Sequence, residues 1–184
     1  MPGYSWTGSA WKKVVRKAIW TGTAWKDIKS SHRWTGSAWE TIYSSFISSG
    51  MTKNGNMAGQ TGSAAYRKII GWTADTATYP GSSVVADGLV AQSTKAGAAI
   101  TAVIDAGSAW NNLTARLQIS VNDTVVVTGP DSRWTTSGGW DVPLTATATV
   151  NISAGDVVTV AMSASPSGNY LTARSGAGTY VRLT

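Results

Sequence analysis

The chain contains no cysteine and little charge. The absence of cysteine from its 184 residues excludes disulfide bonds, thiolate metal sites and cysteine nucleophiles. Charged residues make up 13% of the chain, about half of the usual quarter. The polar surface must therefore be built largely from Ser, Thr, Gly and Asn.

Good helix formers and long apolar runs are also scarce. There are six Leu and a single Glu, Glu40, against 24 Thr and 22 Ser. Because Leu and Glu favour helices whereas Thr and Val suit strands, the composition predicts an all-β fold. No apolar run approaches the roughly 18 residues that span a bilayer, so we expect no membrane association. The first residues lack a basic segment followed by an apolar one, so no secretory signal is expected.

Tryptophan is abundant, with ten Trp against one Phe, and most of it lies in a repeat. Three copies of one six-residue motif occur, with starting points 14 residues apart. They are Trp-Thr-Gly-Ser-Ala-Trp at 6–11, Trp-Thr-Gly-Thr-Ala-Trp at 20–25 and Trp-Thr-Gly-Ser-Ala-Trp at 34–39. A fixed period of this kind indicates repeated supersecondary units.

Each copy predicts a β-hairpin. The glycine tolerates a positive φ in the loop, and the two Trp residues face each other at the strand ends. The period leaves room for two strands of four or five residues, which predicts a small meander or a stack of hairpins over residues 1–47. Because an isolated hairpin is marginal in water, the repeat needs its neighbours, another subunit or a partner surface.

The six repeated Trp side chains are the candidate site residues, either as the core of the hairpins or as a surface that docks on a partner. The rings could also stack on sugars or on nucleic-acid bases. Packing together with protein docking is the favoured interpretation, because the segment has almost no Leu or Phe to form a core. The residues are Trp6, Trp11, Trp20, Trp25, Trp34 and Trp39.

The charge is unevenly distributed along the chain. Residues 1–70 hold ten basic and two acidic residues, a net charge of +8, whereas residues 71–184 have a net charge of −2. Such asymmetry is typical of an arm that docks on an acidic partner. The simpler interpretation, that the lysines only solvate an aromatic segment, is the favoured one for the charge. The small net charge of residues 71–184 argues against nucleic-acid binding outside the arm.

The rest of the chain predicts a linker and a β-sandwich. Residues 48–64 are rich in Gly, Ser and Asn without an apolar period, which predicts a flexible linker. Short β-type segments follow in residues 65–184, separated by turn signals such as Asn122-Asp123 and Ala154-Gly155. About eight strands in about 120 residues indicate a two-sheet sandwich or jelly roll. The expected strands are 65–73, 83–91, 98–105, 113–121, 124–128, 144–152, 156–164 and 169–182.

The sequence offers no recognisable catalytic or metal-binding constellation. His32 is the single histidine and is expected in a turn. The sequence contains no Gly-x-Ser-x-Gly motif to supply a nucleophilic serine for it. One histidine without cysteine cannot supply the usual zinc ligands. The acidic residues of the sandwich are all Asp and mostly fall in predicted turns, where Asp bonds its own backbone. We therefore expect no enzyme activity, no metal and no cofactor. The aspartates of the sandwich are Asp75, Asp87, Asp105, Asp123, Asp131, Asp141 and Asp156.

Two family resemblances arise from particular residues. The stretch 150–160 (Val-Asn-Ile-Ser-Ala-Gly-Asp-Val-Val-Thr-Val), the segment 170–174 and the final 179–183 resemble the end of a tumour-necrosis-factor-like or complement-globular-domain-like jelly roll. Residues 117–126 are similar to the central hairpin of that family. The Trp repeat followed by such a domain resembles accessory virion proteins of tailed phages that infect actinobacteria.

These resemblances imply a function and partners. The jelly-roll family implies a homotrimer. The phage resemblance implies a virion location, as a minor tail or capsid decoration protein whose arm docks on other capsid or tail proteins. The alternative function is a carbohydrate-binding module that recognises a host surface glycan, since Trp ladders and jelly rolls both serve that purpose.

Overall fold

The chain forms an all-β structure in two compact units, Met1–Phe46 and Ile47–Thr184. The computed structural model describes residues 4–13, 17–28, 30–57, 65–108, 113–134, 142–165 and 171–184. These residues contain strands and turns and no helix. The all-β fold expected from the abundance of Thr and Val is thus confirmed.

The first unit contains three separate β-hairpins. Each of the three Trp motifs forms the loop and strand ends of one hairpin, as the sequence predicts. Among the described residues each strand pairs only with its own hairpin partner, so the meander expected from the period is not formed. The pairs are β1 (Tyr4–Trp6) with β2 (Trp11–Lys13), β3 (Ala18–Trp20) with β4 (Trp25–Asp27), and β5 (Ser30–Trp34) with β6 (Trp39–Ser44).

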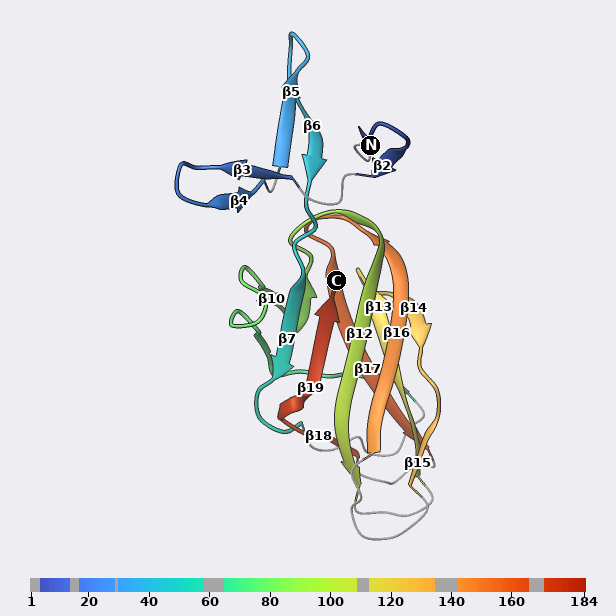
Figure 1. Ribbon diagram of the computed structural model, residues 1–184. Helices are drawn as coiled ribbons and strands as arrows, with labels where there is room; N and C mark the ends of the chain where they lie inside the picture. The colour runs from blue at the N-terminus through green and yellow to red at the C-terminus, as the bar shows by residue number, and fades with distance from the viewer. Residues whose placement is uncertain are drawn as a thin grey trace. The chain divides into compact units, whose positions relative to one another are not determined.

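The second unit is a sandwich of two antiparallel sheets, seen as two layers in Figure 1. The strand order of the first sheet is β10-β11-β17-β13-β14, with β15 also on β13 and β8 on β17. Its seven strands are β8 (Arg67–Lys68), β10 (Val84–Val85), β11 (Gly88–Val90), β13 (Leu113–Val121), β14 (Thr124–Thr128), β15 (Ser132–Trp134) and β17 (Val157–Ser165).

The second sheet has the order β16-β12-β19-β7-β9, with β18 also on β12. Figure 1 shows β7, β19, β12 and β16 side by side in this layer. Its six strands are β7 (Ser49–Lys53), β9 (Trp72–Ala74), β12 (Lys95–Ser108), β16 (Val142–Ile152), β18 (Leu171–Ala173) and β19 (Gly176–Leu183).

The hydrophobic core lies between these two sheets. Alternate residues along each strand point inward, as the buried pattern of β13 shows at every second position from Leu113 to Ile119. The opposite sheet contributes the fully buried side chains of Ile100, Ile104 and Leu183. The alternation of apolar and polar residues in the sequence therefore encodes a sheet with one buried and one solvated face.

The prediction of a flexible linker over residues 48–64 is wrong for the first part of that range, because Ser49–Lys53 forms strand β7. This strand lies inside the second sheet, where it pairs with both β19 and β9. Met51 is fully buried, and Met57 forms a further bridge to Ala173. The Gly- and Ser-rich composition concealed the strand because its pairing depends on distant residues. Residues 58–64 of the expected linker lie outside the described residues.

The expected strand 65–73 is in fact two strands in opposite sheets. Gly71 has a φ of +80° between β8 and β9, which turns the chain from one sheet to the other. The expected strand 169–182 is similarly divided into β18 and β19, whereas β15 was not anticipated. The strands at 113–121 and 124–128 have the predicted bounds.

Both tight turns predicted in the sandwich are confirmed. Asn122 and Asp123 have φ values of 48° and 62°, as a two-residue type I′ hairpin requires. Gly155 has a φ of 92° in the turn between β16 and β17. The Asn122 side chain joins the two turns, since its Nδ2 donates to Asp156 Oδ1 at 2.9 Å and its Oδ1 accepts from the Val157 amide at 2.9 Å.

Candidate functional site: three exposed tryptophan pairs

The repeated loop residues close each hairpin in the same way. In the first hairpin the amide and the hydroxyl of Thr7 both donate to the Ala10 carbonyl, each at 3.0 Å. The corresponding bonds from Thr21 to Ala24 and from Thr35 to Ala38 are 2.9–3.0 Å long. The loop glycines have φ values of 92°, 93° and 97°. The Thr-Gly-x-Ala spacing is thus explained by one hydroxyl bond and one left-handed residue.

We expect Gly22→Ala to unfold the second hairpin selectively. A Cβ at this φ adds about 1–2 kcal/mol of strain, which is enough to disrupt a hairpin that is marginal by itself. Circular dichroism should lose the exciton signal of one of three Trp pairs. The matched control is Thr23→Ala, because the neighbouring loop position already varies between Ser and Thr. Equal loss in both variants would contradict this explanation of the motif.

The two Trp residues of each motif lie directly opposite each other across the hairpin. The register pairs Trp6 with Trp11, Trp20 with Trp25, and Trp34 with Trp39. Their ring centroids are 5.5–5.7 Å apart and their planes are inclined at 52–54°. This is the tilted arrangement that the quadrupoles of two aromatic rings favour. The three pairs are therefore three copies of one structural element.

All six rings remain exposed to solvent. The first ring of each pair is 51–54% exposed and the second is 68–70% exposed. The expectation that the six rings form a miniature core is therefore wrong in this structure, since half or more of each Trp residue stays exposed. The physical reason is that, among the described residues, each hairpin is a two-stranded sheet without a further strand to cover its rings.

Basic residues accompany the exposed rings. Residues 1–46 carry seven Lys and Arg against Asp27 and Glu40, a net charge of +5. Lys12, Lys26 and Arg33 lie on the hairpin strands and are exposed. A surface with large rigid aromatic groups and positive charge is suited to an acidic partner, because aromatic and Arg side chains supply most of the binding energy in protein interfaces.

The single histidine lies in a strand, and the expected turn position is wrong. His32 belongs to β5, where its Nε2 is 3.3 Å from the Ser30 Oγ. Together with Ser31 and Trp39 these residues border a shallow, open depression on the third hairpin. Because the depression is open, a substrate bound there would remain in contact with water. Electrostatic catalysis is effective in a site from which water is excluded.

Several of the aspartates in the sandwich bond backbone groups, as predicted for turn residues. The Asp75 carboxylate accepts from the Thr78 amide, and the Asp87 carboxylate accepts from the amides of Gly71 and Trp72. The Asp156 carboxylate accepts from the Ser153 amide within its own turn. Asp141 lies outside the described residues. These three carboxylates thus have structural roles in positioning loops.

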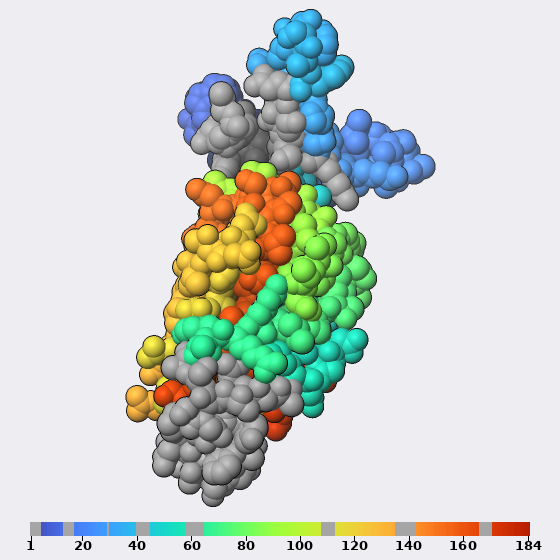
Figure 2. Space-filling model, turned by 180° about the vertical axis from the view of Figure 1, so that it is seen from behind, coloured from blue at the N-terminus to red at the C-terminus, as the bar shows by residue number. Residues whose placement is uncertain are grey.

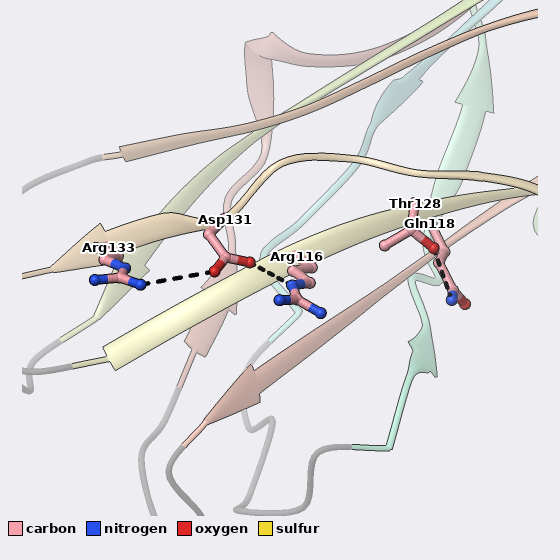
Figure 3. Close-up of polar contacts among 5 residues, drawn as sticks. All are labelled: Arg116, Gln118, Thr128, Asp131 and Arg133. Carbon is pink, nitrogen blue, oxygen red and sulfur yellow. Dashed lines mark hydrogen bonds and ion pairs between the residues drawn. The ribbon is translucent and has the colours of Figure 1, made fainter.

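Asp131 has a different environment, between two arginines on the outer face of the seven-stranded sheet (Figure 3). It accepts a hydrogen bond from Arg116 Nε and lies 3.9 Å from Arg133 Nη2. The hydrogen bond from Arg116 holds the pKa of Asp131 below its ordinary value of 3.8. Gln118, two residues along β13, donates instead to Thr128 at 3.1 Å.

We expect Asp131→Asn to lower stability at neutral pH, with a difference from the parent that shrinks in acid. Because the pKa of Asp131 is lower in the folded chain than its ordinary value, the ion pair stabilises the fold above pH 3.8. This contribution is lost as the pH falls through the lowered pKa. Both side chains are partly exposed, so the effect is small. The urea midpoints of the parent and the variant at neutral and acid pH measure this effect. A difference between the two midpoints that stays constant with pH would contradict the role of the ion pair.

The described residues show neither a metal-ligand cluster nor a membrane-spanning helix. Within them, no group of three or more His, Asp or Glu side chains is placed to hold a metal ion. The same part of the chain has no helix of the length and apolarity needed to cross a bilayer.

Comparison with known proteins gives structural matches for the fold and no match to a protein family. No protein-family model matches the chain, and no curated protein matches it. The solved structure of Eiger TNF from S. frugiperda matches with a TM-score of 0.52 and 13% identity, covering 75% of this chain and 90% of that one. A chain from infectious bursal disease virus, Gx strain, matches with a TM-score of 0.37 and 11% identity, covering 95% of this chain and 46% of that one.

The match to Eiger TNF shows that the chain has an all-β, jelly-roll-like fold similar to that of a tumour necrosis factor. At 13% identity this likeness describes the fold alone. The jelly roll predicted for the C-terminal part of the chain is thereby confirmed.

Proposed function

We propose that the chain is a non-enzymatic structural protein of a virion, a minor tail or capsid decoration component. Its three Trp hairpins dock on other capsid or tail proteins, and its jelly-roll unit is displayed. The threefold repetition of one exposed Trp pair carries this proposal. The virion assignment is supported by the resemblance of the Trp repeat and jelly roll to accessory proteins of tailed phages.

The energetics of the exposed rings favour docking. Each ring presents on the order of 100 Å² of apolar surface, which corresponds to about 2.5 kcal/mol when it is removed from water. Keeping six such rings in solvent is costly unless a partner covers them. Three linked copies also bind a repeated partner surface more tightly than one copy, because the second and third contacts are intramolecular. A virion, which is built from repeated subunits, offers such a surface.

Docking on protein accounts for the pair geometry better than saccharide stacking on these rings. A sugar stacks on a flat ring platform, whereas the two rings of each pair are inclined at 52–54° and share no plane. A tilted pair instead forms a ridge that fits a cleft between side chains. The net positive charge of residues 1–46 adds attraction to an acidic surface. Saccharide stacking would quench the Trp fluorescence of the arm, which provides a direct comparison.

The proposal is tested by removing the arm. The chain Ile47–Thr184, which retains the complete jelly roll, should fail to join virus particles that incorporate the full chain. Quantitative mass spectrometry of purified particles measures the copy number of each. Equal incorporation of both chains would place the attachment surface on the jelly roll and contradict the role of the arm.

We further propose that the jelly-roll unit assembles as a homotrimer through the outer face of its six-stranded sheet. This face presents mainly small and β-branched side chains together with Tyr180 and Arg182, whose guanidinium lies 4.0 Å from the Tyr180 ring centroid. A face of this composition can pack closely against a second copy. Its outward residues include Thr101, Val103, Thr145, Thr147, Thr149 and Tyr180.

Light scattering tests the trimer. We expect three times the chain mass both for the full chain and for Ile47–Thr184, since the contact lies within the second unit. Val103→Lys places a charge at the centre of the face and should reduce the mass to that of a monomer. Val125→Lys, at an exposed valine of β14 in the opposite sheet, is the matched control. A monomeric parent chain would contradict the proposed assembly.

A further inference from the structure

A polar groove lies on the outer face of the seven-stranded sheet, on the opposite side of the sandwich from the proposed trimer face. Figure 2 shows this side of the sandwich, with β13 and β14 in yellow and β17 in orange. The groove has a volume of about 390 Å³, within the range of roughly 300–1,000 Å³ that is common for small-molecule sites. The described residues that line it are Tyr66, Thr114, Arg116, Ser163 and Ser165.

The register of the strands explains why these side chains meet. Arg116 pairs with Ser163, and Thr114 pairs with Ser165, across β13 and β17. Because the intervening residues of both strands point into the core, these four side chains share the outer face. On the other side of β17, strand β8 pairs Arg67 with Met162, which brings the preceding Tyr66 alongside Ser163.

The groove results from the sizes of the side chains in this grid. The small Ser163, Ser165 and Thr114 side chains form its floor, while Tyr66 and Arg116 rise on either side. Ser163 is only 8% exposed. The floor is therefore fixed by the sheet itself, and a ligand would meet hydroxyl groups whose positions are set before it binds.

Arg116 is held in place by its neighbours. Asp131 accepts a hydrogen bond from the Arg116 Nε, as Figure 3 shows. Asp131, and to a smaller extent Tyr66, raise the pKa of Arg116. Since Asp131 offsets the charge of Arg116, the groove combines fixed donors and acceptors without a strong single-sign field.

We propose that this groove binds a saccharide unit. Sugar hydroxyls each donate and accept, and the serine and threonine hydroxyls with the Arg116–Asp131 pair supply both kinds of partner. The Tyr66 side chain adds an apolar ring surface beside them, on which the C–H face of a sugar can pack. A simple anion would use only the donors, and an apolar ligand would leave the hydroxyl floor unpaired. This site is independent of the docking of the arm.

Titration of the full-length ¹⁵N-labelled chain tests this proposal. The probes are glucose, galactose, mannose, arabinose, N-acetylglucosamine and glucuronic acid, each added separately, with inorganic phosphate and acetate as anion probes. We expect at least one sugar to give saturable shifts of the amides in 114–116 and 163–165. Ser163→Val and Arg116→Met should each weaken binding at least tenfold.

Matched variants separate this site from others on the chain. Gln118→Met, which changes an outward residue of the same strand beyond the groove, should leave the affinity unchanged, as should Trp25→Ala in the arm. Should Arg116→Met fail to fold, Ser165→Ala replaces it. The proposal is overturned if no sugar gives saturable shifts, if only phosphate or acetate does, or if the sugar shifts fall in the Trp hairpins.

Discussion

A chain that begins at Ile47 should fold cooperatively, whereas a chain that begins at Ala65 should not. The chain that begins at Ala65 lacks β7, an inner strand whose neighbours are β19 and β9. It also removes the buried side chains of Met51 and Met57. Losing one buried Met side chain costs about 2–5 kcal/mol, and a whole domain is stable by about 5–15 kcal/mol. The loss of both, together with the pairing of an inner strand, exceeds what the domain can tolerate.

Thermal unfolding followed by circular dichroism measures this difference. The full chain and Ile47–Thr184 should share one cooperative transition of the jelly roll, because the three hairpins form sheets of their own. The chain from Ala65 should show no such transition and should aggregate through the exposed edge of β19. A chain from Ala65 that melts at the same temperature would contradict the assignment of β7 to the sandwich.

Removal of Trp pairs should reduce incorporation into particles in steps. Replacing Trp20 and Trp25 by Ala removes one of three equivalent contacts, and we expect apparent affinity to fall about ten- to a hundredfold. Linked contacts raise avidity by roughly 10²–10⁴, so replacing all six rings should abolish incorporation. The physical reason is the loss of apolar area that only the partner can cover.

Conservative variants distinguish the role of the rings from that of the hairpin fold. Replacing Trp20 and Trp25 by Phe keeps a cross-strand aromatic pair and should restore part of the incorporation. Lys26→Gln tests the charge separately and should weaken incorporation more at low salt than at high salt. Copy number per particle, measured by mass spectrometry at limiting chain concentration, reports each effect. Undiminished incorporation of the variant without any Trp pair would contradict the docking role.

Local features of the structure could be predicted from the sequence where one short segment determines them. The Trp-Thr-Gly-x-Ala-Trp motif specifies its hairpin, because loop glycine, threonine hydroxyl and Trp pair all lie within six residues. The turn at Asn122-Asp123 was predictable for the same reason. The strand before it, β13, alternates between apolar and polar residues, and β14 after it is a short run of valines between threonines, so the bounds of both were predicted correctly.

Features that depend on distant partners escaped prediction. The strand Ser49–Lys53 has the composition of a linker, and it becomes a strand through pairing with residues at the end of the chain. The exposure of the Trp rings was likewise not predictable, since it depends on whether another layer covers each hairpin. The groove at Arg116 and Ser163 requires the register of three strands, which no local pattern gives.

The most direct test of the account is the solvent accessibility of the six repeated Trp side chains before and after assembly. Hydroxyl-radical labelling of the free chain should oxidise these residues readily, because they are 51–70% exposed. The buried Trp72 and Trp134 provide internal controls that should react little in either state. We predict that the six rings become protected when the chain is part of a purified virus particle. Equal labelling of these rings in the free and assembled chain would contradict the proposal that they are the docking surface.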